Sequence, residues 1–313
     1  DMAAVPASLV ATRPTLFGAV PRVWEKLKAA LQAGYPGDAV ADSVANPQVA
    51  QTLRAKIGLD EAQWVVTGAA PTPRGVLEFF TALGLPLCEM LGMSEVSCCV
   101  ATNTPAAIRL GSVGRPLTTV EVKIADDGEV LAKAKTLFKG YWQNPQANAD
   151  SWTGDWYHTG DIGELDADGY LTITGRKKDL IVTAGGKNVS PSQLEDLLTS
   201  DPLISQAVVV GDNRSYIAAL VTIDQETFPG WAEKHGKTGE VADLLQDGDL
   251  VGAVQDAVDR ANKSVSRAES IRKFKILAAE FSVEGGELTP TLKLKRNVVH
   301  DRFADDIENL YAK

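Results

Sequence analysis

The sequence predicts an α/β protein with three successive parts: a piece of parallel sheet, an antiparallel barrel-like unit and a small α+β domain. Over residues 63–92 a strand, a Gly-containing turn, a helix and a second strand follow one another. This order is typical of a βαβ unit and therefore of a parallel sheet. From about residue 111 to 175 short strands succeed one another with only turns between them, which indicates an antiparallel or barrel-like unit.

Composition restricts the class of protein. The chain has 313 residues, enough for about two domains. Its 31 Lys and Arg against 41 Asp and Glu give a net charge of −10, which argues against a protein that wraps nucleic acid. No uncharged apolar run approaches the ~18 residues of a membrane-spanning helix. Three clustered cysteines fit no disulfide framework and favour a reducing cytosol, so we expect a cytoplasmic protein with at most a peripheral membrane contact.

The elements of the first part can be placed in order. We expect a helix opened by Pro21, a loop over residues 35–50, a strand over 63–67, a helix over 75–83 and a strand over 86–90 that ends at a turn formed by Leu91 and Gly92. Ligands of parallel sheets bind beyond the carboxyl ends of the strands. The two Gly-containing turns, after residues 67 and 90, occupy that position.

The later elements follow the change in pattern. We expect strands over residues 120–124, 129–134, 162–165 and 170–174, a helix over 191–198, strands over 206–211 and 216–223, a largely helical stretch over 238–264 and a strand over 271–277. The last five of these elements define the small α+β domain.

Several attractive motifs fail on spacing. Gly236-Lys237-Thr238 lacks the glycine and the preceding strand that a phosphate loop needs. Gly92 to Val96 lacks the second glycine of a nucleophile elbow. The three histidines, at positions 158, 235 and 300, have no partner at helical ligand spacing, so we expect no zinc site.

Two segments flanking a predicted hairpin carry chemistry together. Residues 157–163 are Tyr-His-Thr-Gly-Asp-Ile-Gly, and residues 175–181 are Gly-Arg-Lys-Lys-Asp-Leu-Ile. In this order they closely resemble the adenylate-forming superfamily, and more narrowly the AMP-forming fatty acyl-CoA synthetases of the long-chain or bubblegum type. Further segments support the resemblance across nearly the whole chain, namely residues 68–71, 91–95, 111–116, 138–142 and 288–293.

The resemblance implies a fold, a reaction and its partners. The fold would be the latter part of the large AMP-binding domain, residues 1–177 with the barrel-like subdomain at about 111–175, followed by a C-terminal lid domain, residues 178–313. The activity would be that of a fatty acid–CoA ligase, with fatty acid, ATP, coenzyme A and Mg²⁺ as partners and no nucleic acid. Because the reaction is mostly positioning and charge stabilisation, it needs cations, a metal ligand and a nucleotide cradle.

Family positions map onto nucleotide-binding residues. The resemblance implies that Asp161 accepts the ribose hydroxyls and that Arg176 also contacts the ribose. Gly68, Ala69 and Ala70 lack bulk and would let the backbone approach adenine. The segment Leu91-Gly92-Met93 would lie beside the nucleotide, and Ser94 would donate to the α-phosphate. Glu95 would be a catalytic residue and the Mg²⁺ ligand; the alternative is a simple charge at a helix N-terminus.

The lid would bring two further groups to the nucleotide. Lys293 would stabilise charge on the α-phosphate in the first step; the alternative is one solvated face shared with Lys295 and Arg296. Lys178 matches the hinge position. The loop of Gly185, Gly186 and Lys187 would admit the pantetheine arm of coenzyme A, with an ordinary turn as the alternative.

The sequence also departs from the resembled pattern. Leu91 stands where the family usually has an aromatic residue that stacks on adenine. The Ser/Thr/Gly-rich phosphate loop does not occur in these residues, so we expect an upstream half to be missing through truncation, proteolysis or a split gene, and this chain to be inactive alone. Two alternatives stay open: a non-catalytic nucleotide-binding or interaction module, and an aryl-acid or carrier-protein adenylating enzyme.

Overall fold

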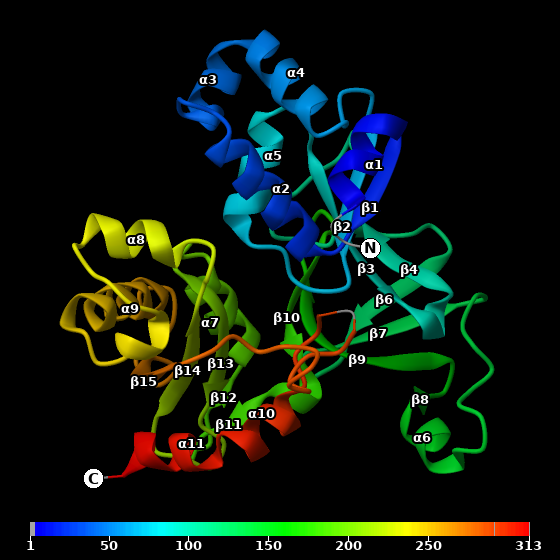
Figure 1. The fold of residues 1–313 in the computed structure, drawn as a ribbon. Helices are drawn as coiled ribbons and strands as arrows, with labels where there is room; N and C mark the ends of the chain where they lie inside the picture. Colours follow the sequence, from blue (N-terminus) through cyan, green and yellow to red (C-terminus); the bar gives the residue numbers. More distant parts are fainter. Residues whose placement is uncertain (1–3, 291, 313) are drawn as a thin grey trace. The chain divides into compact units, whose positions relative to one another are not determined.

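The computed structural model describes residues 4–290 and 292–312 (Figure 1). The chain divides into two compact units, Asp1–Thr174 and Gly175–Lys313. The first unit contains two five-stranded sheets, and the second contains a three-stranded sheet with a short hairpin.

The five-stranded sheet has the order β1-β2-β3-β4-β5. Strands β2 and β3 are parallel, as expected; β1, which the sequence did not predict, is parallel to β2, and β4 and β5 are antiparallel additions. The strands are β1 (Leu16–Ala19), β2 (Trp64–Gly68), β3 (Leu87–Met93), β4 (Cys98–Thr102) and β5 (Arg115–Pro116). The helices of this part are α1 (Val5–Thr12), α2 (Pro21–Ala33), α3 (Ala39–Ala45), α4 (Pro47–Lys56) and α5 (Arg74–Ala82). Trp24, Phe79 and Phe80 lie in its core with their side chains almost fully buried.

Two expectations in this part are wrong. Residues 35–50, expected to be a loop, contain α3 and the start of α4. The turn-forming residues act as helix caps: Asp38 accepts hydrogen bonds from the amides of Val40 and Ala41, and Asn46 accepts one from Gln48, with Pro47 at the first helical position. Strand β3 also does not end at a turn at residues 91 and 92; it continues to Met93 because β4 pairs with it there.

The antiparallel unit confirms the second change in pattern. Its order is β10-β9-β7-β6, with β8 paired to β9. The elements are β6 (Val120–Ile124), β7 (Glu129–Ala134), α6 (Pro145–Asp150), β8 (Trp152–Thr153), β9 (Trp156–Leu165) and β10 (Leu171–Arg176). Along β9 every second residue is buried from Tyr157 to Gly163, as expected for a strand with one face in a core.

The second unit is the small α+β domain. Strands β13 (Ile204–Val210) and β14 (Ile217–Ile223) are antiparallel, and β15 (Ile271–Leu277) runs parallel to β14. All seven residues of β14 are buried, since one core lies on each face of this sheet. The stretch 238–264 is largely helical, as expected, because it contains the short helix Val241–Asp243 and α9 (Gly248–Asn262). The other elements are β11 (Ile181–Val182), β12 (Asn188–Val189), α7 (Pro191–Thr199), α8 (Phe228–Lys234), α10 (Arg296–Arg302) and α11 (Ala304–Tyr311).

Candidate functional site

The nucleotide cradle predicted from the sequence falls at the ends of β2 and β3. Gly68 lies opposite Met90 in the parallel register, and a Cβ on Gly68 would stand 2.9 Å from the Met90 carbonyl oxygen. Ala69 follows with a φ of 71°, in the left-handed region that favours glycine, and both Ala69 and Ala70 are exposed. The backbone beyond β2 is therefore open to a ligand, as the predicted adenine contact requires.

Gly92 is fixed by strand pairing. A Cβ at this position would overlap the carbonyl oxygen of Cys98 on the adjacent strand. Its neighbour Leu91 is half-buried and packs against two core clusters, Met93 is half-buried and Ser94 is exposed. The glycine thus has a structural reason, the close approach of β3 and β4, in addition to any contact with a nucleotide.

Glu95 lies in a short 3₁₀ helix (Ser94–Val96) and is held from the loop that follows β7. The Phe138 amide donates to the Glu95 carbonyl oxygen at 2.8 Å, and the Tyr141 hydroxyl donates to Glu95 Oε1 at 3.0 Å. Tyr141 also shares a 3.2 Å hydrogen bond with the Tyr157 hydroxyl. The sequence analysis included residues 138–142 in the family resemblance but assigned Tyr141 no role. The one available indication of a role was that this tyrosine lies within a motif segment.

Asp161 lies on β9 with 4% of its surface exposed. Its amide donates to Thr159 Oγ1 at 3.1 Å, and that hydroxyl donates to the Val130 carbonyl oxygen. The next residue toward the N-terminus, Gly160, has a φ of 72° and donates its amide to Glu129 Oε1 at 3.0 Å. The bend that presents Asp161 is therefore held by the Thr159 side chain of the same strand and the Glu129 side chain of the neighbouring strand β7.

Glu129 and His158 form a pair that sequence reasoning missed. Glu129 is 3% exposed, and its Oε2 lies 2.8 Å from His158 Nδ1. The other ring nitrogen of His158 lies 2.8 Å from Thr153 Oγ1. His158 is thus engaged by a carboxylate and a hydroxyl, and no group of three metal-ligating side chains occurs among the described residues.

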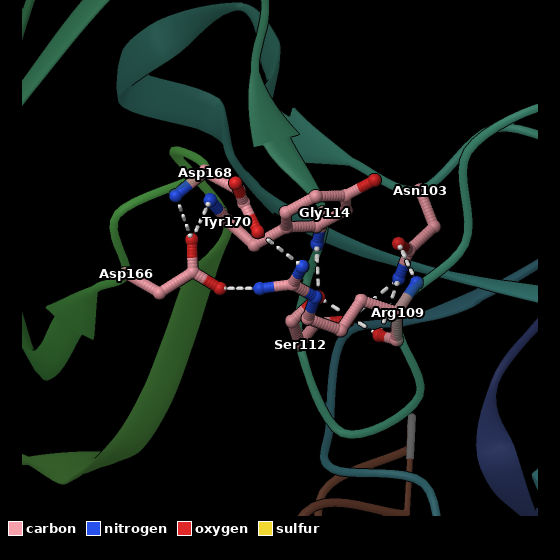
Figure 2. A network of polar contacts seen from close by, with 7 residues as sticks. All are labelled: Asn103, Arg109, Ser112, Gly114, Asp166, Asp168 and Tyr170. Carbon is pink, nitrogen blue, oxygen red and sulfur yellow. Dashed lines mark hydrogen bonds and ion pairs between the residues drawn. The ribbon is translucent and has the colours of Figure 1, made fainter.

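The segment 111–116 is fixed by the network in Figure 2. Arg109 pairs with Asp166 and, at 2.7 Å, with Asp168, and its guanidinium lies 4.2 Å from the centre of the Tyr170 ring. Asn103 holds the other side of the loop through the carbonyl oxygen of Ser112 at 2.6 Å. This network ties the loop before β5 to the β9–β10 hairpin.

The fixed loop presents an amide to Glu89 on β3. Gly111 donates its amide to Glu89 Oε2 at 3.0 Å. Burial raises the pKa of Glu89 from 4.5 to about 7, and the Gly111 hydrogen bond offsets this only in part. Glu89 is thus a carboxyl group of the first unit that titrates near neutral pH, and sequence reasoning gave no signal for it.

Arg176, predicted to contact the ribose from the large domain, is exposed, and so are the predicted lid residues. Arg176 ends β10, and Lys178 lies in a short 3₁₀ helix (Lys177–Asp179). In the loop between β11 and β12, Gly186 has a φ of 76° and donates its amide to the Thr183 carbonyl oxygen at 2.8 Å. Gly186 therefore serves an ordinary turn, whereas the nearest atom to a Cβ on Gly185 would be 3.9 Å away.

Two lid lysines differ in their surroundings. Lys187, beside the glycines, lies 3.4 Å from Glu269. Lys293 is exposed near the tip of a hairpin between β15 and α10. Thr291, one residue of the motif 288–293, lies outside the described residues. The structure thus brings residues 68 and 90–93 together on neighbouring strands, and it places Asp161 and Lys293 in different units.

Comparison with known proteins decides the family. Residues 1–142 match the AMP-binding enzyme family, and residues 178–313 match the AMP-binding enzyme C-terminal domain. A long-chain-fatty-acid–CoA ligase of Mycobacterium tuberculosis is 49% identical over 267 residues, which cover 85% of this chain and 44% of that protein. The chain belongs to the AMP-binding enzyme family.

Other relatives agree with this assignment. A long-chain-fatty-acid–CoA ligase of Gallus gallus is 35% identical over 96% of this chain and 46% of its own length. The chain therefore spans about half the length of the curated relatives it matches. No helix among the described residues combines the length and the apolar character needed to cross a membrane.

Solved structures show the adenylate-forming fold. The adenylation domain of a carboxylate reductase from Mycobacterium chelonae superposes with a TM-score of 0.78 at 24% identity, over all of this chain and 49% of that one. O-succinylbenzoate coenzyme A synthetase from Bacillus subtilis, in complex with ATP and magnesium ion, gives 0.67 at 23% identity, over 95% of this chain and 54% of that one. At these identities the likeness concerns the fold alone.

The residues of the site fit a magnesium nucleotide. Mg²⁺ is commonly bound by one or two carboxylates together with substrate phosphates and water. Glu95 offers one half-buried carboxylate whose Oε1 is oriented by Tyr141. This is the ligand set that a metal held mainly by ATP would need from the protein.

Proposed function

We propose that this chain is the C-terminal part of a fatty acid–CoA ligase that activates a fatty acid with ATP and transfers it to coenzyme A. The 49% identity to a long-chain-fatty-acid–CoA ligase over 85% of the chain carries this proposal. The buried Asp161 and the oriented Glu95 support it, since each lies where the family motif requires a carboxylate. We place the reaction in the cytoplasm, with membrane contact at most peripheral.

In the first step a carboxylate oxygen of the fatty acid attacks the α-phosphorus of ATP, and pyrophosphate leaves. In the second, the sulfur of coenzyme A attacks the acyl carbonyl carbon, AMP leaves and the thiol proton passes to solvent. Asp161 would bind the ribose hydroxyls, and Arg176 would assist it. Lys293 would stabilise the negative charge that grows on the α-phosphate. Glu95 would hold the metal, which neutralises phosphate charge when bound.

The lid would serve the two steps in turn. Lys178 would be the hinge, and a few dihedral changes there would exchange Lys293 for the loop of Gly185, Gly186 and Lys187. The exposure of all these residues supports this assignment, because a lid side chain that contacts a ligand held by the large domain has to be accessible at the surface of the lid.

A longer protein that includes this chain provides the test. We expect it to release pyrophosphate only when ATP, Mg²⁺ and a fatty acid are all present, and we expect E95Q to raise the Mg²⁺ concentration needed for half-maximal rate. The exposed Glu121 supplies the matched control, E121Q. A protein that binds AMP but never turns over, even when an upstream half is supplied, would favour the non-catalytic module instead. Activation of aryl acids in preference to fatty acids would favour the third alternative.

A further inference from the structure

Lys293 lies in a small hairpin that is closed by hydrogen bonds between its own residues. Thr289 donates its amide to the Lys293 carbonyl oxygen at 2.8 Å, and Lys293 donates its amide to Thr289 Oγ1 at 3.0 Å. Below the tip, Leu288 and Leu294 form an antiparallel bridge, and the Lys295 amide donates to the Glu287 carbonyl oxygen at 2.7 Å. The position of Lys293 therefore depends on how the base of this hairpin is fixed.

The first side of the base is fixed by Glu287. Its side chain is almost fully buried and forms an ion pair with Arg302, the last residue of α10. Burial by itself acts to raise the pKa of Glu287, but hydrogen bonds from backbone amides, including that of Ser282, together with the Arg302 charge outweigh it, so the pKa lies below its usual value. Glu287 is thus a buried carboxylate that depends on its partners.

The second side of the base continues directly into α10. Arg296, the first residue of this helix, donates Nη1 to Glu195 Oε1 at 2.7 Å and pairs through Nη2 with Glu195 Oε2. Glu195 lies on α7, is 9% exposed and also accepts the Val209 amide of β13 at 2.8 Å. A two-point contact between a guanidinium and a carboxylate fixes orientation as well as distance.

The two ion pairs share one helix, α10, and together fix the base of the hairpin. Both arginines lie on α10, one at each end, and their carboxylate partners lie on the hairpin and on α7. An apolar contact also joins α10 to the hairpin. Val299, on the same helix, is fully buried in a core cluster that also contains Leu288. Any shift of α10 therefore moves both ends of the hairpin.

We propose that Arg296 and Arg302 of α10, with Glu195 and Glu287, are positioning residues that set where Lys293 stands for the adenylation step. The inference rests on the proposed function of Lys293. Replacing Glu287 removes the buried carboxylate that Arg302 and the Ser282 amide hold, and removing one partner of the Arg296–Glu195 pair leaves a largely buried charge without its counter-charge. Either change loosens the base, so the exposed lysine is no longer held at one place. Thioester formation, which does not use Lys293, should be unaffected.

The test uses the longer protein and separates the half-reactions. We expect E287Q to lower fatty-acid-dependent ATP–pyrophosphate exchange about 10- to 100-fold through kcat, with the KM for ATP within about twofold. Transfer from supplied acyl-adenylate to coenzyme A should stay within about twofold. The control is D306N, which removes an ion pair between α11 and β15 outside the hairpin; we expect it to change neither rate.

Hydrogen exchange supplies a readout independent of activity. In E287Q the amides of Lys293 and Lys295 should exchange faster, while those of β14 should exchange as in the parent protein. If E287Q fails to fold, R302K decides, because it keeps the charge and loses only the guanidinium geometry; we expect a smaller loss of the same kind. Normal adenylation in the variant that folds, or an equal loss of both half-reactions, overturns the proposal.

The outcomes also separate this inference from the proposed function. If the parent protein shows no fatty-acid-dependent exchange, the proposed function fails. If the parent is active, K293A is impaired and E287Q is not, the proposed function stands and the positioning role alone fails.

Discussion

Gly92 and Gly185 are both predicted to lie beside a ligand, yet the two regions that hold them differ. A Cβ on Gly92 would overlap the backbone of Cys98, whereas a Cβ on Gly185 would meet its nearest atom, Thr183 Oγ1, at 3.9 Å. The charged residues differ in the same way, because Asp161 is 4% exposed and Lys293 is exposed. The sheet-borne residues are thus built into the fold, and the lid residues are presented to solvent.

Because of this difference, substitutions in the two regions should affect different properties of the protein. Replacing a built-in residue perturbs folding together with function, because its surroundings are close-packed. Replacing an exposed loop residue should leave stability nearly unchanged and alter only what the residue does to a ligand.

K293A should have the largest effect, and it is the sharpest test of the exposed lid residues. Loss of a cation that stabilises developing charge should lower adenylation about 10²- to 10³-fold, or about 3–4 kcal/mol. The melting temperature should stay within about 1–2 °C. Pyrophosphate exchange and calorimetry measure the two quantities, with K295A as the neighbouring control. Adenylation at the parent rate in K293A would assign the role elsewhere.

The glycine pair tests the comparison directly. G92A should lose about 3 kcal/mol or more of unfolding free energy, because β3 and β4 must separate to admit a methyl group. G185A should change stability by less than about 1 kcal/mol. Urea unfolding of both variants measures this. Equal stability losses would show that the lid loop is as tightly determined as the strand pair.

D161N asks what a buried carboxylate contributes to binding. The amide keeps the shape but loses the charge-assisted hydrogen bonds to a ribose, so AMP affinity should fall about 10- to 100-fold, or about 1.5–3 kcal/mol. Isothermal titration calorimetry measures it, and E164Q, an exposed position of the same strand, is the control. Unchanged affinity would remove Asp161 from the nucleotide site.

Glu89, a residue of strand β3, should make the stability of the folded protein depend on pH. Burial raises its pKa to about 7, so between about pH 4.5 and 7 the folded state holds a proton that the unfolded state has released. Its contribution to stability is therefore present at low pH and is lost as pH rises through 7. The stability of E89Q relative to the parent should rise by about 2–3 kcal/mol over this window. Denaturant titrations at pH 5 and 8 measure it; a difference that does not change with pH would exclude the raised pKa.

L91F has the smallest expected effect and would raise affinity. Restoring an aromatic ring at this position should improve AMP binding about fivefold, or about 1 kcal/mol, if the ring can stack on adenine. Calorimetric titration of AMP measures the gain. Because Leu91 also packs against two core clusters, the unfolding midpoint should be recorded with it. Lower affinity at unchanged stability would place adenine away from this residue.

Local patterns predicted most elements but not every boundary. The strand over 271–277 and the helix at Pro21 were correct because apolar periodicity and an N-terminal proline act within a few residues. The loop expected over 35–50 was wrong because Asp38 and Asn46 serve equally well in turns and as helix caps. The end of β3 was misplaced because its partner β4 extends it, and pairing is not a local property.

The sequence by itself determined the order of the motifs, the family they indicate and the residue types offered to a nucleotide. Only the tertiary structure decided which side chains hold these residues in place. His158 meets Glu129 across 29 residues, Tyr141 meets Glu95 across 46, and Arg296 meets Glu195 across 101. The physical reason is that a buried polar group must find a partner, and which partner it finds depends on the strands and helices that the fold places beside it.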